Sequence, residues 1–437
     1  MKIADLRRSI DYDAAGRDLY GMVAELYPIC RSITGNGLRD TLTRVADHIA
    51  LQAHEVPTGT PVFDWTIPNE WNIADAWVKN AAGERVIDFN RSNLHVLNYS
   101  VPVRRKVALA ELKQHLHSMP EHPAWIPYRT SYYEENWGFC IEHERLVALA
   151  ESEYEVCIDS RLEPGSLTYG ECVVAGETSE EFLFSCHACH PSLCNDNLSG
   201  IALVTYLAKL LQPLELRYSY RFLFVPGTIG SITWLSRNAE RTANIRHGLV
   251  VACVGDGGRF HYKRSRRGAP IDRAVEHVLR HSGKDHTILE FSPYGYDERQ
   301  YCSPGFDLPV GSLTRTPHSR YPEYHTSADN LDLVAPHYLA ESLARYLEVI
   351  DVVEGNRRYY NTKPMGEPQL GKRGLYRALG GLPDVERARM ALLWVLNLSD
   401  GAHSLLDIAT RADLDFWTIH EAAMLLIDHG LLADTSV

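Results

Sequence analysis

Ser185-Cys-His-Ala-Cys-His-Pro-Ser-Leu-Cys-Asn-Asp-Asn-Leu-Ser-Gly200 is the stretch that decides the fold of this chain. The apolar run Phe182–Phe184 before it predicts a buried strand, and residues 201–211 after it carry apolar side chains at helical spacing. We therefore expect His187 at the carboxyl end of a strand and Asp196 just before a helix. Ligands of open α/β sheets bind at that edge, and an imidazole beside a carboxylate suits zinc. The stretch predicts a metal site, although these residue types are also common in ordinary loops.

Cys186 and Cys189 form a Cys-x-x-Cys pair, which could indicate redox chemistry or a zinc knuckle. The pair lies at a predicted strand end rather than at the start of a helix, and the sequence has no second such pair. Redox activity is therefore the weaker interpretation. The nine cysteines are an odd number at irregular spacing, which is typical of reduced thiols, so we expect a cytoplasmic protein.

Composition excludes several classes of protein. The 437 residues are enough for two to three domains, and the 45% hydrophobic and 23% charged residues are ordinary for a globular protein. The net charge of −12 does not favour binding to nucleic acid. The first 20 residues lack the apolar segment of a signal peptide, and no apolar run is long enough to span a membrane.

Residues 1–54 and 151–358 predict one α/β domain, a mostly parallel sheet with helices on both faces. Strands are expected at 155–159, 167–174, 181–187, 218–225, 247–254 and 307–314, and helices at 13–30, 38–51, 198–211, 228–238, 270–280 and 337–353. Strands that alternate with helices in this way are typical of parallel sheets that are covered on both sides.

Residues 55–150 differ in composition and predict an inserted β-rich domain. Proline, tryptophan and tyrosine are frequent there, and residues 85–89 and 93–97 predict short strands. The aromatic side chains of residues 124–133 could bind a ligand, but we favour the interpretation that they fill a small core.

Residues 365–437 predict a winged-helix-like domain, with helices at 384–397, 404–412 and 415–429. From residue 404 onward there is one basic residue, Arg411, against six acidic residues. A helix that reads DNA needs lysine or arginine for phosphate contacts, so we expect a packing or protein-contact module. Three domains also allow a homo-oligomer, although no particular residue argues for one.

Two further loops carry candidate ligands. His325, in Tyr324-His-Thr-Ser-Ala-Asp-Asn330, follows the last predicted strand, which places it at the same sheet edge as His187 and Asp196. Asp256, in Val254-Gly-Asp-Gly-Gly258, follows another strand and either donates a carboxylate or is a plain turn residue.

On these residues the chain resembles the zinc-dependent aminopeptidase superfamily, and more closely bacterial aminopeptidase-like proteins with an inserted β-rich domain and a C-terminal winged helix. The matching positions are His187, Asn195–Gly200, Thr228–Ser231, Tyr324–Thr326 and Asp329. The resemblance implies that His187 and Asp196 bind zinc, with the aspartate bridging two ions in the superfamily. It also implies that His325 binds the second ion, and it matches Asp256 loosely to a further carboxylate ligand.

The sequence departs from the superfamily at Gly227 and Thr228, where two acids are expected, one as general base and one as metal ligand. Loss of a positioned base costs roughly 10²–10⁴ in rate. Asp297, Glu298 and Glu323 are the candidates for a relocated base, and a surface ion pair is the alternative role of Glu298. Because Thr228 replaces a ligand, we expect one tightly held zinc rather than two.

Our first hypothesis is a metal-dependent hydrolase in which zinc, held by His187, Asp196 and His325, polarises a carbonyl and activates water. The resemblance implies a peptide or small amide substrate with a free amino group. The alternative is a non-catalytic ligand-binding or scaffold protein on an aminopeptidase fold, which the replacement at Gly227 would explain. A DNA-binding regulator is disfavoured by the acidic tail.

Overall fold

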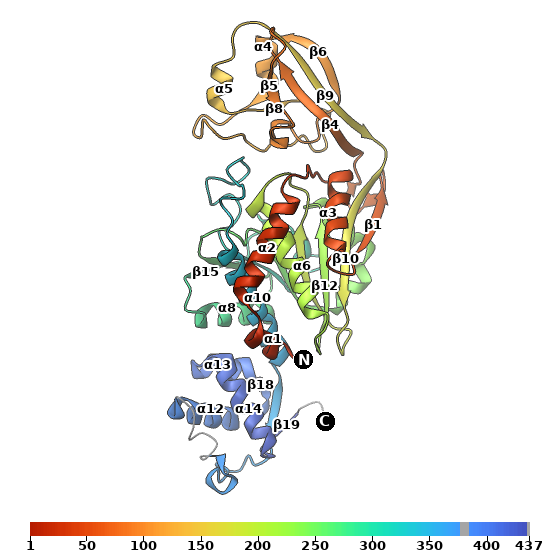
Figure 1. Ribbon diagram of the computed structural model, residues 1–437. Coiled ribbons are helices and arrows are strands. Elements are labelled where there is room, and N and C mark those ends of the chain that lie inside the picture. Colours follow the sequence, from red (N-terminus) through yellow and green to blue (C-terminus); the bar gives the residue numbers. More distant parts are fainter. Residues whose placement is uncertain (376–383, 435–437) are drawn as a thin grey trace.

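An eight-stranded mixed sheet forms the centre of the computed structural model, which describes residues 1–375 and 384–434 (Figure 1). The strands lie in the order β1 (Gln52–Pro57), β10 (Ser166–Val174), β12 (Ser219–Val225), β11 (Glu181–His187), β13 (Ile245–Val251), β16 (Val310–Thr314), β14 (Phe260–Lys263) and β15 (His286–Leu289). The central strands β12, β11, β13 and β16 are parallel to one another, as expected. β1, β10 and β14 pair antiparallel towards the two edges. The short strands β1, β14 and β15 were not predicted because they contain no buried apolar run.

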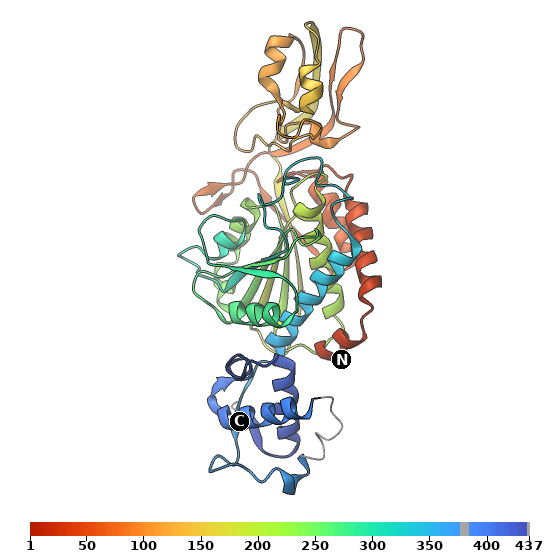
Figure 2. The ribbon, with the colours of Figure 1, turned by 90° about the vertical axis from the view of Figure 1, so that its left-hand side faces the viewer.

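Helices cover both faces of this sheet, which confirms the predicted α/β class (Figure 2). One face carries α1 (Ile3–Ser9), α2 (Tyr12–Leu26), α3 (Asn36–Ala46), α6 (Ser199–Leu211), α8 (Pro270–His281) and α10 (Pro336–Gly355), and the other carries α7 (Ile229–Arg237), α9 (Glu298–Tyr301) and the turn η4 (Ala239–Asn244). Along β11, Phe182 and Phe184 pack into the first core and Leu183 into the second. Burial on both faces is why this strand is continuously apolar in sequence.

The inserted domain has its own antiparallel sheet in the order β5 (Arg85–Asp88), β4 (Glu70–Lys79), β9 (Glu153–Glu163), β6 (Val103–Ala108). Its smaller elements are β2 (Pro61–Val62), β3 (Trp65–Thr66), η1 (Asn93–His95), α4 (Leu109–Leu112), η2 (Lys113–His115), β7 (Leu116–His117), β8 (Phe139–Cys140) and α5 (His143–Val147).

In this region one predicted strand belongs to a different sheet, and one strand prediction was wrong. Residues 155–159 belong to β9 of the inserted sheet and not to the α/β domain, because Val156 and Ile158 pair with Val78 and Ala76 of β4 and share their core. Residues 93–97 form the turn η1 followed by extended chain, because the Ser92 hydroxyl accepts a hydrogen bond from the Leu94 amide and starts the turn.

Within its described residues, the C-terminal domain combines three helices with a three-stranded sheet, as in a winged helix. The helices are α12 (Val385–Leu398), α13 (Leu405–Ala412) and α14 (Phe416–Asp428), the sheet order is β18 (Asp400–Ser404), β17 (Arg358–Asn361), β19 (Leu432–Asp434), and η5 (Gly371–Arg373) precedes them. The domain begins before the predicted residue 365, because β17 is short and mostly polar. Residues 376–383 and 435–437 of the predicted range lie outside the described residues.

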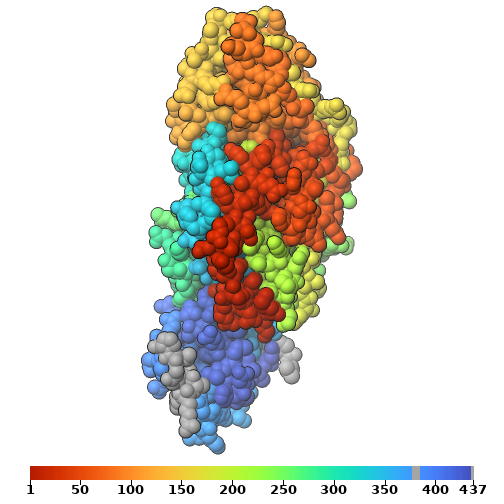
Figure 3. Space-filling model, viewed as in Figure 1, coloured from red at the N-terminus to blue at the C-terminus, as the bar shows by residue number. Residues whose placement is uncertain are grey.

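This C-terminal domain packs directly on the α/β domain, next to the N-terminal helix (Figure 3). The Arg7 guanidinium lies 4.2 Å from the ring centroid of Trp417, and the Trp417 indole donates to Asp351 at 2.8 Å. A third contact joins Arg273 of α8 to Asp407 of α13. No helix within residues 1–375 and 384–434 is both long and apolar enough to span a bilayer.

Candidate metal site

Three histidines converge on the carboxylate of Asp196 at the carboxyl edge of the sheet. His187 is the last residue of β11, and Asp196 lies in the irregular turn η3 (Cys194–Leu198) that leads into α6. His187 Nε2 lies 2.8 Å from Asp196 Oδ1, while His190 Nδ1 and His325 Nε2 lie 3.2 and 3.1 Å from Oδ2. His325 therefore meets His187 at the edge where the sequence predicted it.

The loop that carries Asp196 is held from a distant segment. Asp329, which is fully buried, accepts hydrogen bonds from the backbone amides of Asn195 at 2.6 Å and Asp196 at 3.0 Å. The side chain of Asn195 in turn accepts from the Gly255 amide at 2.9 Å. These bonds fix the position of the carboxylate before any ligand binds.

The protonation states of the cluster suit a cation. Burial lowers the pKa of His187 to about 4, so its ring is neutral near pH 7 and has a free lone pair. Burial opposes ionisation of Asp196, but the neighbouring His190 and His187 outweigh it and hold the pKa of that carboxyl well below its usual range. Burial opposes protonation of His190, but the Asp196 carboxylate outweighs it and raises the pKa of that ring, so a metal ion bound there would displace a proton. Imidazole nitrogens with an ionised carboxylate are a donor set that zinc takes in proteins.

His190 is the member of the cluster that sequence reasoning missed. The ligand atoms of His187, His190 and Asp196 all lie within 4.8 Å of one another. His325 joins them through Asp196, and its side chain is 31% exposed whereas those of His187 and His190 are almost fully buried. The spacing His187-x-x-His190 in the sequence was the available signal.

Asp256, the fourth predicted ligand, contacts the side chain of Asn195, the residue before Asp196. Its oxygens accept from the Gly258 amide at 2.9 Å, the Asn195 side chain at 3.3 Å and the Thr316 hydroxyl. Cys253 lies three residues before Asp256 and next to the histidine cluster. Its Sγ is 3.9 Å from Asp196 Oδ1. Its place directly after the end of β13 could have drawn attention to it.

Two of the three candidate bases, Asp297 and Glu298, are neighbours in the chain but lie in different surroundings. Glu298 forms an ion pair with Lys263 at 2.8 Å and accepts a hydrogen bond from the Tyr296 amide. Both oxygens of its carboxylate therefore already have partners. Asp297 is fully buried, and one oxygen accepts from the Ser231 hydroxyl at 2.6 Å while Oδ2 has no hydrogen-bond partner. Burial raises the pKa of Asp297 to about 7, which suits proton transfer near neutral pH. Ser231 lies in the first turn of α7, next to the Gly227 loop.

A pocket of about 440 Å³ opens over His187 and Asp196. Its walls include Lys263, Tyr296 and Glu298. We expected the aromatic loop 124–133 of the insert only to fill a core, but Tyr128 packs edge-on against His190 and His325, at centroid distances of 5.2 and 5.0 Å. The Tyr128 amide donates to the His325 carbonyl at 2.7 Å, so the inserted domain forms one side of the site.

The ring of Tyr296 fills the space beside Gly227. A Cβ atom at residue 227 would lie 2.3 Å from Cε1 and 2.5 Å from the hydroxyl oxygen of this tyrosine. The same ring lies 4.1 Å from the His187 ring, and its hydroxyl is 3.5 Å from His190 Nε2. A tyrosine thus lies beside the position where the superfamily has its general base.

Gly227→Ala is expected to lower the free energy of unfolding by about 1–3 kcal/mol, because the new methyl group overlaps Tyr296. In a Tyr296→Ala background the same substitution should cost clearly less, and urea unfolding of the four proteins would measure this coupling. Equal costs in both backgrounds would contradict the proposed overlap. Gly21→Ala, at a helical position with no atom within 4 Å of the new Cβ, is the control.

The fold and site together define an aminopeptidase-like protein with a winged-helix domain. The chain belongs to the family described as "Domain of unknown function (DUF4910)", whose profile matches residues 20–356, and a winged helix-turn-helix profile matches residues 357–434.

Relatives agree with this assignment. A candidate polysaccharide biosynthesis protein with an aminopeptidase-like domain from Clostridium acetobutylicum is 54% identical over 409 residues, which are 93% of this chain and 94% of that protein. The crystal structure of a candidate peptidase from C. acetobutylicum superposes with a TM-score of 0.95 at 51% identity, covering 99% of this chain and 100% of the other. BSAP, a zinc aminopeptidase from Bacillus subtilis, shares the fold at a TM-score of 0.56 and 10% identity, with 77% and 94% covered.

Proposed function

We propose that this protein is a metal-dependent hydrolase that cleaves an amide bond in a peptide or small amide substrate. The observation that carries the proposal is the convergence of three imidazoles on Asp196 at the floor of a pocket. Imidazole nitrogen donors and one buried carboxylate match the preferences of zinc, and the shared fold of zinc aminopeptidases supports the same chemistry.

One zinc ion would be held by His187, His190 and Asp196, with His325 beside them. Three protein ligands leave a coordination position open, as in catalytic zinc sites. When bound, zinc would polarise the substrate carbonyl and lower the pKa of water. Because Thr228 replaces an acidic ligand, we expect a single ion.

The remaining steps fall to side chains of the chain itself. We assign Asp297 as the acceptor of the proton from the attacking water, because burial raises its pKa to about 7 and its buried Oδ2 has no hydrogen-bond partner. Burial raises the pKa of Tyr296 well above its ordinary value, so its phenol stays protonated and can donate a hydrogen bond to developing negative charge. Tyr128 covers His190 and His325 and limits the access of water.

A non-catalytic ligand-binding protein is the second candidate. The packing of Tyr296 against Gly227 favours it, because the tyrosine occupies space that a general base fills in the superfamily. In this case the pocket would bind an amide or peptide ligand, with or without metal, and release it unchanged.

Turnover on a substrate panel distinguishes the two candidates. The zinc-loaded protein is incubated with aminoacyl amides, dipeptides and N-acylated amino sugars, the last because a 54% identical relative is a candidate polysaccharide biosynthesis protein. We expect hydrolysis that a chelator abolishes and zinc restores. Saturable binding by calorimetry without any product would instead support the ligand-binding candidate.

A further inference from the structure

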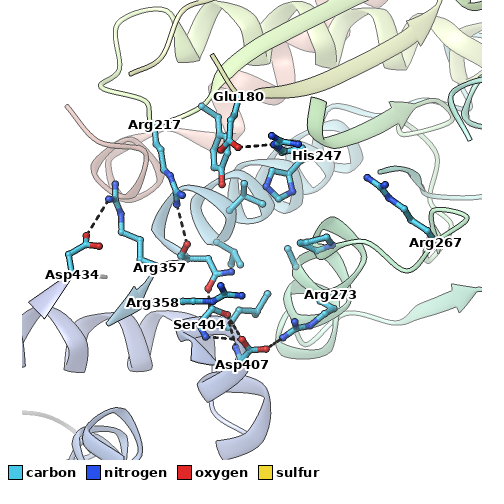
Figure 4. Close-up of a pocket in the computed structure, with 18 residues that line it drawn as sticks. Glu180, Arg217, His247, Arg267, Arg273, Arg357, Arg358, Ser404, Asp407 and Asp434 are labelled. Atoms are coloured by element: carbon cyan, nitrogen blue, oxygen red, sulfur yellow. Dashed lines mark hydrogen bonds and ion pairs between the residues drawn. The ribbon is translucent and has the colours of Figure 1, made fainter. Parts of the chain in front are cut away.

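A second cavity, of about 540 Å³, lies between the α/β domain and the winged-helix domain, on the opposite side of the core from the inserted domain (Figure 4). The α/β domain contributes the segments around Arg217, Arg246 and α8, and the winged-helix side contributes β17 and the start of α13. The C-terminal end of α10 contributes the buried residues Val352 and Val353 to its lining. Neither the candidate metal site nor the resemblance to aminopeptidases involves this cavity.

The cavity is strongly basic although the whole chain carries a net charge of −12. Six arginines line it, namely Arg217, Arg246, Arg267, Arg273, Arg357 and Arg358, against three acids, Glu180, Asp407 and Asp434. Each of these acids forms an ion pair with one of the arginines: Glu180 with Arg246 at 2.7 Å, Asp407 with Arg273, and Asp434 with Arg357 at 3.8 Å. An excess of three positive charges therefore remains over the acids of the lining.

Two of the arginines lie on opposite walls without a strong acidic partner in the lining. Arg267, which is exposed just before α8, forms no ion pair within residues 1–375 and 384–434. Arg217 donates to the Asn356 carbonyl at 3.3 Å and lies 4.9 Å from the ring centroid of Tyr218. Figure 4 shows both side chains at the cavity, with Arg357 and Arg358 below Arg217.

A buried polar atom adds to the case for a ligand. His247 lines the cavity, is only 8% exposed, and its Nδ1 has no hydrogen-bond partner. A buried ring nitrogen without a partner is costly, and a bound ligand would satisfy it. The N-terminal ends of α8 at Pro270 and of α13 at Ser404 also line the cavity, but the side chains of Asp272 and Asp407 already occupy them.

We propose that this interdomain cavity binds a small molecule that carries a diphosphate group, such as a nucleoside diphosphate. Arginine presents a planar fork that matches phosphate oxygens, and guanidinium groups on two walls suit an anion with two charged centres. A volume of about 540 Å³ lies within the range of small-molecule sites. Because both domains supply arginines, the ligand joins the winged-helix domain to the α/β domain.

Calorimetric titration of the full-length protein with inorganic pyrophosphate and with ADP tests this proposal. We expect saturable binding of both, with no binding of uncharged adenosine by itself. Arg267→Ala and Arg358→Ala, one from each wall, should each weaken binding about tenfold, as expected for a charge-assisted hydrogen bond. Arg104→Ala, at an exposed position of β6 in the inserted domain, should leave the affinity unchanged.

Three results would overturn the proposal. The first is absence of binding at millimolar pyrophosphate and ADP, and the second is binding that is insensitive to both cavity variants. The third is tighter binding of a DNA duplex with the same arginine dependence, which would make the cavity part of a nucleic-acid surface. Thermal unfolding of each variant confirms that it is folded before titration. Arg267 is exposed and unpaired, so at least that variant is expected to fold normally.

Discussion

His187→Ala and His190→Ala are expected to abolish the zinc content of the purified protein. Wild-type protein incubated with zinc and then desalted should retain about one ion per chain, because two imidazoles and a carboxylate form a three-ligand site. Replacement of a group that only supports a metal ligand costs about 10–100-fold in metal affinity, and loss of a ligand should cost more than that. Elemental analysis of the desalted proteins measures the content directly and does not depend on any assay of activity.

Zinc content also measures how much His325 contributes to metal binding. His325→Ala should weaken zinc binding less than His187→Ala, because His325 lies outside the close group of His187, His190 and Asp196 and is partly exposed. His261→Ala is the matched control, since His261 lines the same pocket but its ring bonds to the Arg315 carbonyl at 2.8 Å. Wild-type protein that retains no metal even after incubation with excess zinc would remove the basis of the hydrolase proposal.

Asp297→Asn is expected to lower kcat by roughly 10²–10⁴ when the protein is assayed on its best substrate, the range for loss of a general base. A base must be ionised to act, and burial raises the pKa of Asp297 to about 7, so wild-type activity should rise as pH increases through about 7. In Asp297→Asn that rise should disappear. Glu298→Gln is the control at the neighbouring acid, whose carboxylate is paired with Lys263, and it should keep the rise near pH 7.

The same substitution has a separate effect on stability. The carboxyl has a higher pKa in the folded chain than in the unfolded chain, so between about pH 4 and pH 7 the folded state binds more protons. The contribution of Asp297 is therefore complete at low pH and is lost as pH rises through about 7, by up to about 4 kcal/mol. Urea unfolding of the metal-free protein at pH 5 and pH 8 should show a smaller difference for Asp297→Asn than for wild type. Equal differences would show that this carboxyl does not titrate as the structure implies.

Local patterns were sufficient to predict the elements around the metal site. The strand ending at His187, the helix from Ser199, and the helices near 228–238 and 337–353 all follow from apolar spacing over short windows. These elements are buried on one or both faces, so the positions that are apolar in the sequence are the positions that are buried in the structure. Local patterns did not predict the turn at 93–97, the sheet to which strand residues 155–159 belong, or the short edge strands, because turn hydrogen bonds and long-range pairing decide them.

By itself, the sequence determined the α/β class, the winged-helix tail, and the placement of His187, Asp196 and His325 at one edge of the sheet. Only the tertiary structure decided which side chains meet there. His325 reaches Asp196 across 129 residues, and Tyr296 fills the space beside Gly227 from a distant loop. The burial of Asp297 and the arginine-lined cavity likewise depend on segments far apart in the chain. The physical reason is that contacts, desolvation and pKa shifts arise from neighbours in space, which short-range sequence periodicity does not specify.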